Sequence, residues 1–248
     1  MKINKNIELI DLAVLVDKTL IISDVHIGFE EYLNAKGILV PRFHFKDTIK
    51  KLDELFDKLK KRKIKIERII VNGDLKHEFG TISRQEWKET LEILDYFSSK
   101  AKEIVLIKGN HDNILGPIAK KKNLQIMDSY SIGGILIIHG NKKIKIPKEI
   151  KTLIIGHEHP AITIRDKTKY EKYKCFLLGK YERKTLLVMP SFNTLLEGTD
   201  ILKEKLLSPF LHDISKFKAY VVADKIYDFG IVKNLEKRFS FSNKKSLR

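Results

Sequence analysis

Six of the eight histidines in this chain lie in five short polar motifs, each of which follows a short apolar run. The motifs are Ser23-Asp24-Val25-His26, Asn72-Gly73-Asp74-Leu75-Lys76-His77, Gly109-Asn110-His111-Asp112, His139-Gly140-Asn141 and Gly156-His157-Glu158-His159. Together they offer carboxylate and amide oxygens and imidazole nitrogens but no thiolate, a donor set that suits Mn, Fe, Ni or Zn. The set is larger than one ion needs. It fits two ions that share a carboxylate, an arrangement suited to displacement at phosphorus.

Taken one at a time, these motifs are weak signals. An Asp-x-His pair occurs by chance, and Gly-Asn-His-Asp at 109–112 could be a simple turn because Asn and Asp favour turns. Their weight comes from the joint pattern, since five motifs follow five apolar runs in one chain. We therefore interpret them as parts of one site.

The apolar runs that precede the motifs have the pattern of buried strands. They are residues 20–22, 69–71, 104–107, 135–138 and 153–155. Runs that are apolar on both faces are expected of strands buried between two layers. Between the early runs, residues 45–59 and 85–97 have apolar side chains on one helical face. The alternation predicts a layered α/β domain, with the motifs gathered beyond the carboxyl ends of its strands.

After the last motif the pattern changes to strands joined by short turns. These are residues 161–164, 174–178, 186–189, 220–223 and 227–232, and they predict a second, more antiparallel sheet. No linker separates this part from the rest, so we expect a single domain over residues 1–238. The basic residues 239–248 are expected to form a flexible tail.

The composition indicates a globular protein. The chain has 248 residues, of which 43% are hydrophobic and 32% charged, so it is long enough to bury a sizeable core. No apolar run approaches the roughly 18 residues of a membrane span, and no apolar stretch typical of a secretory signal follows the N-terminus. A single cysteine, Cys175, rules out an internal disulfide framework. We expect a cytoplasmic location and no membrane association.

The formal net charge of +16 has two interpretations. It can serve a polyanionic partner such as DNA or RNA. It can also reflect a Lys-, Glu- and Ile-rich composition of the kind met in proteins of heat-loving organisms. Because the basic residues are dispersed along the chain, the charge favours a polynucleotide only mildly.

The five motifs, in their order, resemble the signature of the calcineurin-like metallophosphoesterase superfamily. That signature reads D-x-H, G-D-x-x-[DH], G-N-H-[DE], a histidine before a small residue, and G-H-x-H. The resemblance implies an α/β fold, namely a four-layer α/β/β/α sandwich with two mixed β-sheets, and a site for two divalent ions. Mn²⁺ is the first expectation, with Fe, Ni or Zn as alternatives. The implied ligands are Asp24, His26 and His159 for the first ion, Asn110, His139 and His157 for the second, and Asp74 as the bridge between them.

The same resemblance implies roles for two further residues. His111 would lie near the scissile phosphate as a general acid or as a stabiliser of the transition state, and Asp112 would orient His111. A hydroxide bridging the metals would attack phosphorus in line, while the metals offset charge on the equatorial oxygens.

A narrower resemblance rests on residues 72–77 and 190–193. These segments are similar to small archaeal phosphoesterases related to the Mre11/SbcD nucleases and to DNA-ligase-associated phosphoesterases. Candidate substrate contacts are His77, Arg42, His44 and Asn193. For His77 a capping or core role is equally open, and Arg42 and His44 could be ordinary exposed residues at a helix entry.

We therefore expect a metal-dependent phosphoesterase that hydrolyses phosphodiester bonds in nucleic acid or nucleotide substrates. The alternatives are a nucleotide pyrophosphatase or phosphomonoesterase, a non-catalytic scaffold on the same fold, and a DNA-binding protein. A homodimer and a DNA-repair partner are associations left open by the sequence.

Overall fold

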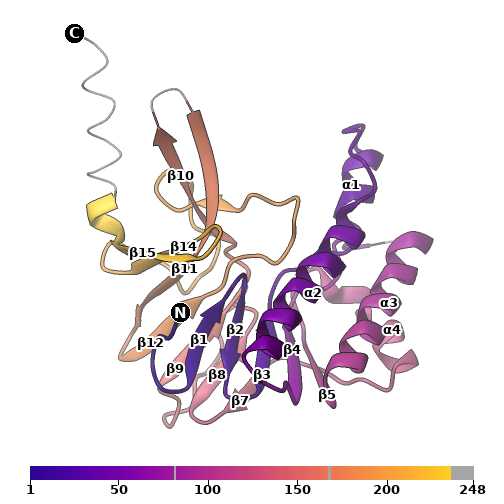
Figure 1. Cartoon of the computed structure of the whole chain (residues 1–248), viewed down its shortest axis with the longest axis horizontal. Coiled ribbons are helices and arrows are strands. Elements are labelled where there is room, and N and C mark those ends of the chain that lie inside the picture. Colours follow the sequence, from indigo (N-terminus) through magenta and orange to yellow (C-terminus); the bar gives the residue numbers. More distant parts are fainter. Residues whose placement is uncertain (81, 167–168, 236–248) are drawn as a thin grey trace.

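The computed structural model describes residues 1–80, 82–166 and 169–235, with the backbone alone for 165 and 166. Two mixed β-sheets lie face to face, and helices cover the outer side of one of them (Figure 1). This arrangement confirms the expected α/β sandwich with two mixed sheets. The tail expected at 239–248, and the boundary expected at 238, lie outside the described residues.

Within the described residues, the first sheet has six strands in the order β1-β2-β3-β4-β5-β6. Their bounds are Ile7–Ile10 (β1), Ala13–Val16 (β2), Thr19–Ile22 (β3), Arg68–Asn72 (β4), Glu103–Ile107 (β5) and Ile126–Met127 (β6). Strands β3 to β6 run parallel, so their carboxyl ends lie at one edge of the sheet. Strands β3, β4 and β5 contain the first three apolar runs of the sequence, as expected.

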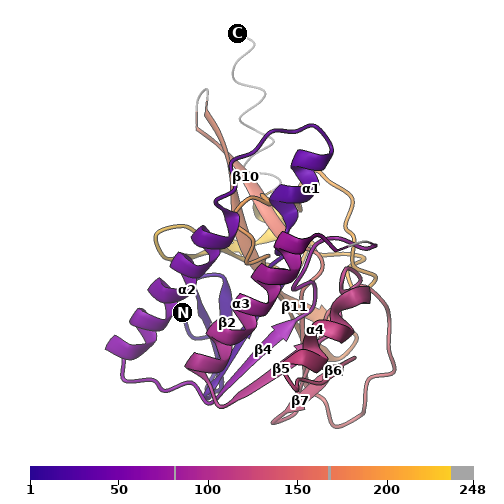
Figure 2. The same ribbon diagram turned by 90° about the vertical axis from the view of Figure 1, so that its right-hand side faces the viewer.

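Three helices cover the outer face of this sheet (Figure 2). They are α2 (His44–Lys61), α3 (Arg84–Lys100) and α4 (Leu115–Lys121). In α2, Leu52, Leu55 and Leu59 are at most 1% exposed, because a spacing of three and four residues places them on one face. Helix α3 begins after Ser83, whose hydroxyl accepts a hydrogen bond from the Glu86 N–H at 3.0 Å. The helices predicted at 45–59 and 85–97 are thus confirmed.

In the described part of the chain, the second sheet has nine strands. Its main path runs β13-β10-β11-β12-β9-β8-β7, and β14 pairs with β11 and β15. The bounds are Tyr130–Ile132 (β7), Ile135–Ile138 (β8), Thr152–Ile155 (β9), Pro160–Asp166 (β10), Lys169–Tyr181 (β11), Lys184–Val188 (β12), Thr199–Asp200 (β13), Lys218–Val222 (β14) and Ile226–Ile231 (β15). Strands β8, β9 and β12 are parallel to one another and the others mostly antiparallel. Strands β10 and β11 form a long hairpin that extends beyond the body of the sandwich (Figure 1).

An apolar layer joins the two sheets. Its centre includes Ile21 and Ile70 from the first sheet and Ile137, Ile154 and Leu187 from the second, none of which has exposed surface. Burial of each such side chain contributes about 1.5–3 kcal/mol. Because further apolar clusters cover both outer faces, the central strands are buried on both sides, which explains their uninterrupted apolar sequences.

The outer face of the second sheet is covered differently from that of the first. Phe210, Leu211 and Phe217 pack on it from the segment between β13 and β14. Over the described part of the chain, this fourth layer consists mainly of loops and turns, where the resemblance implied helices. No helix among the described residues combines the length and the apolar character that a membrane crossing needs.

Candidate metal centre

The five polar motifs lie together at the carboxyl ends of strands from both sheets. Strands β3, β4 and β5 of the first sheet and β8 and β9 of the second each lead into one motif. Backbone hydrogen bonds tie these loops to one another. The Asp24 N–H donates to the Gly73 carbonyl at 3.2 Å, and the Gly156 N–H donates to the His139 carbonyl at 2.9 Å. The site therefore spans the line along which the two sheets meet.

One cluster of donor atoms is formed by Asp24, His26 and His159, within 4.8 Å of one another. The Nε2 atoms of His26 and His159 are 3.4 Å apart, and Asp24 Oδ1 lies 3.1 Å from His159 Nε2. Two ligands at about 2.1 Å from one ion are roughly 3.0–3.4 Å apart in octahedral or tetrahedral coordination. These three side chains have the spacing of ligands to a single ion.

A second cluster is formed by Asp74, His139 and His157, also within 4.8 Å. The Nε2 atom of His139 lies 3.0 Å from Asn110 Oδ1 and 3.2 Å from Asp74 Oδ2. Its Nδ1 atom faces the Asn72 carbonyl oxygen at 3.2 Å. Metal-binding histidines commonly direct their second ring nitrogen to a carbonyl, which fixes the ring and leaves the other nitrogen for the metal. The surroundings of His139 fit that pattern.

Asp74 lies between the two clusters. Its Oδ2 is 3.2 Å from His139 Nε2 and 3.8 Å from His26 Nε2. Its Oδ1 accepts a hydrogen bond from the His111 N–H at 2.8 Å. One oxygen is thus fixed by the backbone and the other is directed at both clusters, the geometry that a carboxylate shared by two ions requires.

Burial and neighbouring charges set the protonation of these groups. Burial lowers the pKa of His26 well below its usual range and that of His157 to about 4, so both imidazoles are neutral at pH 7. Burial alone would raise the pKa of Asp24, but the charge and hydrogen bond of His159 outweigh it and hold the value at about 2. For His139, burial lowers the pKa, but the hydrogen bond and charge of Asp74 raise it to about 9. The potential beside Asp74 therefore favours a cation.

The backbone of the proposed ligands is strained. Asp24, His26, Asp74, His157 and His159 all have positive φ, between 50° and 63°. Such a left-handed conformation costs a non-glycine residue about 1–3 kcal/mol and is concentrated at functional sites. Five strained residues in one crevice indicate loops shaped for a site more than for stability.

The carboxylate of Asp112 is bonded to the backbone of two loops. It is buried and accepts hydrogen bonds from the N–H groups of Gly109, Asp74 and Leu75 at 3.0, 2.7 and 3.1 Å. This differs from the expectation that Asp112 orients His111, because the carboxylate oxygens are already engaged with backbone donors. Asp112 instead fixes the loop after β5 to the loop after β4.

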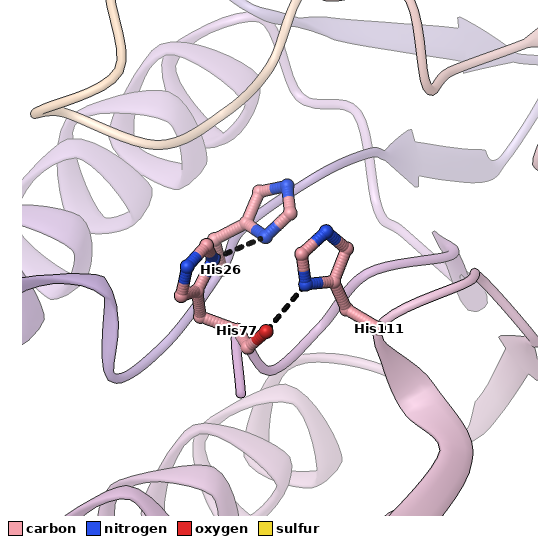
Figure 3. Close-up of side chains that lie close together, drawn as sticks. All are labelled: His26, His77 and His111. Carbon is pink, nitrogen blue, oxygen red and sulfur yellow. Dashed lines mark hydrogen bonds between the residues drawn. The ribbon is translucent and has the colours of Figure 1, made fainter. Parts of the chain in front are cut away.

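The ring of His77 joins His26 and His111 in a third group of donor atoms (Figure 3). The His77 Nδ1 atom lies 3.1 Å from His26 Nδ1, and the backbone carbonyl oxygen of His77 faces His111 Nδ1. The carbonyl of His77 therefore takes the position at the His111 ring that was expected for Asp112. The sequence offered no signal for a backbone contact of this kind.

Asn193, an expected substrate contact, is buried beneath the site. Its amide N–H donates to the Val25 carbonyl at 2.9 Å, and its amide oxygen accepts from the N–H groups of Leu195 and Leu196 at 2.8 and 2.9 Å. The residue has no exposed surface. Asn193 thus has a structural role in place of the expected substrate contact, because it joins the loop after β12 to the loop after β3.

The other two expected substrate contacts lie near α1 (Phe29–Ala35). His44 is only 1% exposed, and its backbone N–H donates to the Glu30 carboxylate at 2.7 Å. It is therefore a buried residue, unlike the substrate contact or exposed helix-entry residue that the sequence indicated. Arg42 is exposed and pairs with Glu31 at 2.9 Å. Its contact with a substrate stays a prediction.

A lysine that the sequence did not single out supports the loop after β12. The Ser191 hydroxyl donates to the Asp24 carbonyl at 2.8 Å. The Lys174 ammonium on β11 donates to the carbonyls of Ser191, at 2.9 Å, and Asn193. Burial, assisted by the charge of Lys51, lowers the pKa of Lys174 to about 7. Part of its side chain lines a cavity of about 310 Å³ beside α2.

Two packed mixed sheets with an Asp/His/Asn crevice at their shared edge are typical of phosphoesterases that use divalent metals. The model of the calcineurin-like phosphoesterase family matches residues 18–193. The chain belongs to this family. No curated protein sequence matches the chain.

Solved structures that are similar to this chain come from several organisms. Nuclease MPE from Pseudomonas putida has a TM-score of 0.60 and 20% identity, over 88% of this chain and 92% of that one. YfcE, a phosphoesterase from E. coli, has a TM-score of 0.41 and 12% identity, over 86% and 98%. Vps29 complexed with zinc, from Entamoeba histolytica, has a TM-score of 0.34 and 16% identity, over 86% and 99%. At these identities we take from the first of them the fold alone.

Proposed function

We propose that this protein is a phosphodiesterase that depends on two divalent cations and acts on nucleic acid or nucleotide substrates. The observation that carries the proposal is the position of Asp74 Oδ2, between His139 Nε2 at 3.2 Å and His26 Nε2 at 3.8 Å. One carboxylate oxygen directed at two ligand clusters is the arrangement that a pair of ions needs.

The two ions would be held by donors of different kinds. Asp24, His26 and His159 would bind one ion, and Asn110, His139 and His157 the other, with Asp74 shared. When bound, such ions activate water as a nucleophile and offset negative charge on the phosphoryl oxygens. Oxygen and imidazole donors without sulfur make Mn²⁺ the first choice, with Fe, Ni and Zn as alternatives.

His111 is placed where it could transfer a proton to or from the substrate. Its Nδ1 faces the His77 carbonyl, so its Nε2 remains for the crevice, 4.0 Å from Asp74 Oδ2. Burial lowers the pKa of His111 in spite of the Asp74 charge. A bound phosphodiester adds negative charge nearby and raises that pKa. The protonated ring can then donate to the leaving oxygen, or stabilise charge on the phosphoryl group.

Fewer observations support a nucleic acid or nucleotide as the substrate than support metal-dependent phosphoester hydrolysis. Nuclease MPE, the structural neighbour with the TM-score of 0.60, makes nucleic acids the first polymers to test. The net charge of +16 is compatible with them. A pyrophosphatase, a phosphomonoesterase, a non-catalytic scaffold and a DNA-binding protein remain the competing hypotheses.

The decisive experiment is hydrolysis of bis-p-nitrophenyl phosphate by the purified chain loaded with Mn²⁺. We expect turnover by the wild type and a loss of at least about a hundredfold in Asp74→Ala and His111→Ala. His212→Ala is the matched control, because His212 is exposed and outside the motifs. A wild type that is inert with Mn, Fe, Ni and Zn refutes the proposal.

A substrate panel then separates the competing hypotheses. It includes aryl monoesters, a nucleotide pyrophosphate, 2′,3′- and 3′,5′-cyclic nucleotides, and single- and double-stranded DNA. Faster hydrolysis of monoesters or pyrophosphates than of any diester contradicts the proposed substrate class. Stoichiometric protein or DNA binding without any turnover favours a scaffold or a DNA-binding protein.

A further inference from the structure

Aromatic rings surround the His77–His111 pair beside the candidate metal centre. The Phe79 ring lies over the His111 ring, with 3.7 Å between the centroids and 34° between the planes. Phe29 and Tyr32 of α1 meet His77 edge-on at centroid distances of 4.8 and 4.7 Å. We name these five residues the aromatic wall. The wall joins α1 to the loop after β4.

Phe79 is half open to solvent. It is 49% exposed, whereas the His111 side chain beneath it is 14% exposed. A single exposed apolar side chain is common on protein surfaces, so what distinguishes Phe79 is its contact with the His111 ring beside the candidate metal centre. The tilted contact with His111 covers part of the Phe79 ring, and its exposed part is available to a ligand.

A nucleobase is the ligand that suits this surface best. Bases stack on aromatic rings whatever their sequence, and each stacked base strengthens binding about 5- to 150-fold. The Lys36 ammonium lies 5.7 Å from the centroid of the Tyr32 ring. A cation at the edge of the wall can pair with a phosphate next to the stacked base.

We propose that the aromatic wall is a subsite for an unpaired nucleobase, with Phe79 as the stacking surface. The inference rests on the proposed function and names its substrate class, which is a single-stranded nucleic acid or a nucleotide. Inside a duplex both faces of a base are covered by neighbouring base pairs. Duplex DNA can therefore use the wall only where bases are frayed or flipped out.

The position of the wall ties base binding to the reaction. His111 belongs both to the wall and to the reacting region, with its Nε2 4.0 Å from Asp74 Oδ2. A base on Phe79 would hold the adjoining phosphate close to His111 and the two ligand clusters. The subsite thus selects for a base at the nucleotide next to the scissile bond, without selecting which base.

Binding of two oligomers of equal charge tests the inference. One is a short oligothymidylate and the other an abasic oligomer of the same length, both fluorescein-labelled and with a cleavage-resistant phosphorothioate backbone, titrated by anisotropy in Mn²⁺ at low salt. We expect the wild type to bind the base-bearing oligomer about tenfold more tightly. Phe79→Ala should abolish most of this difference, and Phe79→Trp should retain it.

Two more variants complete the design. Tyr32→Leu keeps the apolar bulk but removes a ring, and should reduce the tenfold difference. Tyr227→Ala removes an exposed aromatic ring from β15, outside the wall, and should leave the difference unchanged. Competition by free thymidine monophosphate and by a blunt duplex distinguishes a nucleotide, a strand and a double helix as the preferred ligand.

Several outcomes overturn the inference. They are equal affinity of the wild type for the two oligomers, no measurable affinity for either, and a tenfold difference that persists in Phe79→Ala. Hydrolysis of the aryl diester, measured on the same preparations, reports separately on the proposed function. Hydrolysis of the aryl diester without discrimination between the two oligomers supports the proposed phosphodiesterase function and contradicts the nucleobase subsite.

Discussion

Lys174 makes a specific prediction about how the stability of this protein changes with pH. Its ammonium group lies under the loop after β12 and donates to the carbonyls of Ser191 and Asn193. Burial, with the charge of Lys51, lowers its pKa from 10.5 to about 7. Lys174→Met keeps the length of the side chain and removes the ionisable group, so it isolates this contribution.

The sign and size follow from proton linkage. Between pH 7 and 10.5 the unfolded chain keeps the Lys174 proton and the folded chain has lost it, so the free energy of unfolding rises with pH. A shift of 3.5 pKa units corresponds to at most about 5 kcal/mol, at 1.36 kcal/mol per unit. Because Lys174 lines a cavity that water can enter, a rise of about 2–4 kcal/mol is expected.

Urea denaturation at intervals between pH 6.5 and 9.5 measures the effect. The wild-type free energy minus that of Lys174→Met should rise over this range, since other groups titrate equally in both proteins. Lys180→Met is the control, because Lys180 is exposed on the same strand and donates only to Thr185 Oγ1 at 3.1 Å among the contacts described. A flat difference curve refutes the reasoning about Lys174.

Three more predictions concern stability. Asp112→Ala leaves the buried N–H groups of Gly109, Asp74 and Leu75 without an acceptor, so urea denaturation should show a loss of at least about 3 kcal/mol; a loss under 1 kcal/mol contradicts the bridging role. Phe97→Ala should lower the free energy of unfolding by about 3–5 kcal/mol, because the ring has no exposed surface and its removal opens a cavity under α3, whereas a near-neutral result contradicts this packing. Mn²⁺ at a hundred times its Kd should stabilise the fold by about 2.7 kcal/mol, which raises the melting temperature, and EDTA should reverse the rise. Asp74→Asn should not show this rise, and equal melting temperatures of the wild type in Mn²⁺ and in EDTA would contradict specific binding.

The strands that carry the motifs were predictable because their surroundings are uniform. Ile21 and Ile70 face the second sheet while Leu20 and Ile69 face the helices, so every position of such a strand must be apolar. Helices α2 and α3 were predictable for the complementary reason that only one face is buried. That β8 and β9 belong to the second sheet could not be predicted in this way. A short apolar run indicates a buried strand but does not indicate which sheet the strand joins.

Individual roles in the site were harder to predict than its location. Asp112 and Asn193 occur where a reacting or binding side chain was expected, but their polar atoms bond to backbone groups of other loops. Such partners depend on which loops meet in space, and residue type does not specify them. The same holds for Lys174, a lysine within a strand whose apolar neighbours gave no reason to expect its contacts.

The two ligand clusters also bear on how firmly the two sheets are held in register. Each draws donors from both sheets, since Asp24 and His26 follow β3 whereas His159 follows β9, and Asp74 follows β4 whereas His139 follows β8. The apolar layer between the sheets holds them together without fixing their alignment, because dispersion and the hydrophobic effect are not directional. Ions bound by both clusters would link the two sheets, because sliding one sheet over the other by a fraction of an ångström would distort the coordination of both ions. The resistance of the two sheets to sliding over each other would then be set at the carboxyl ends of these strands, where the candidate metal centre lies.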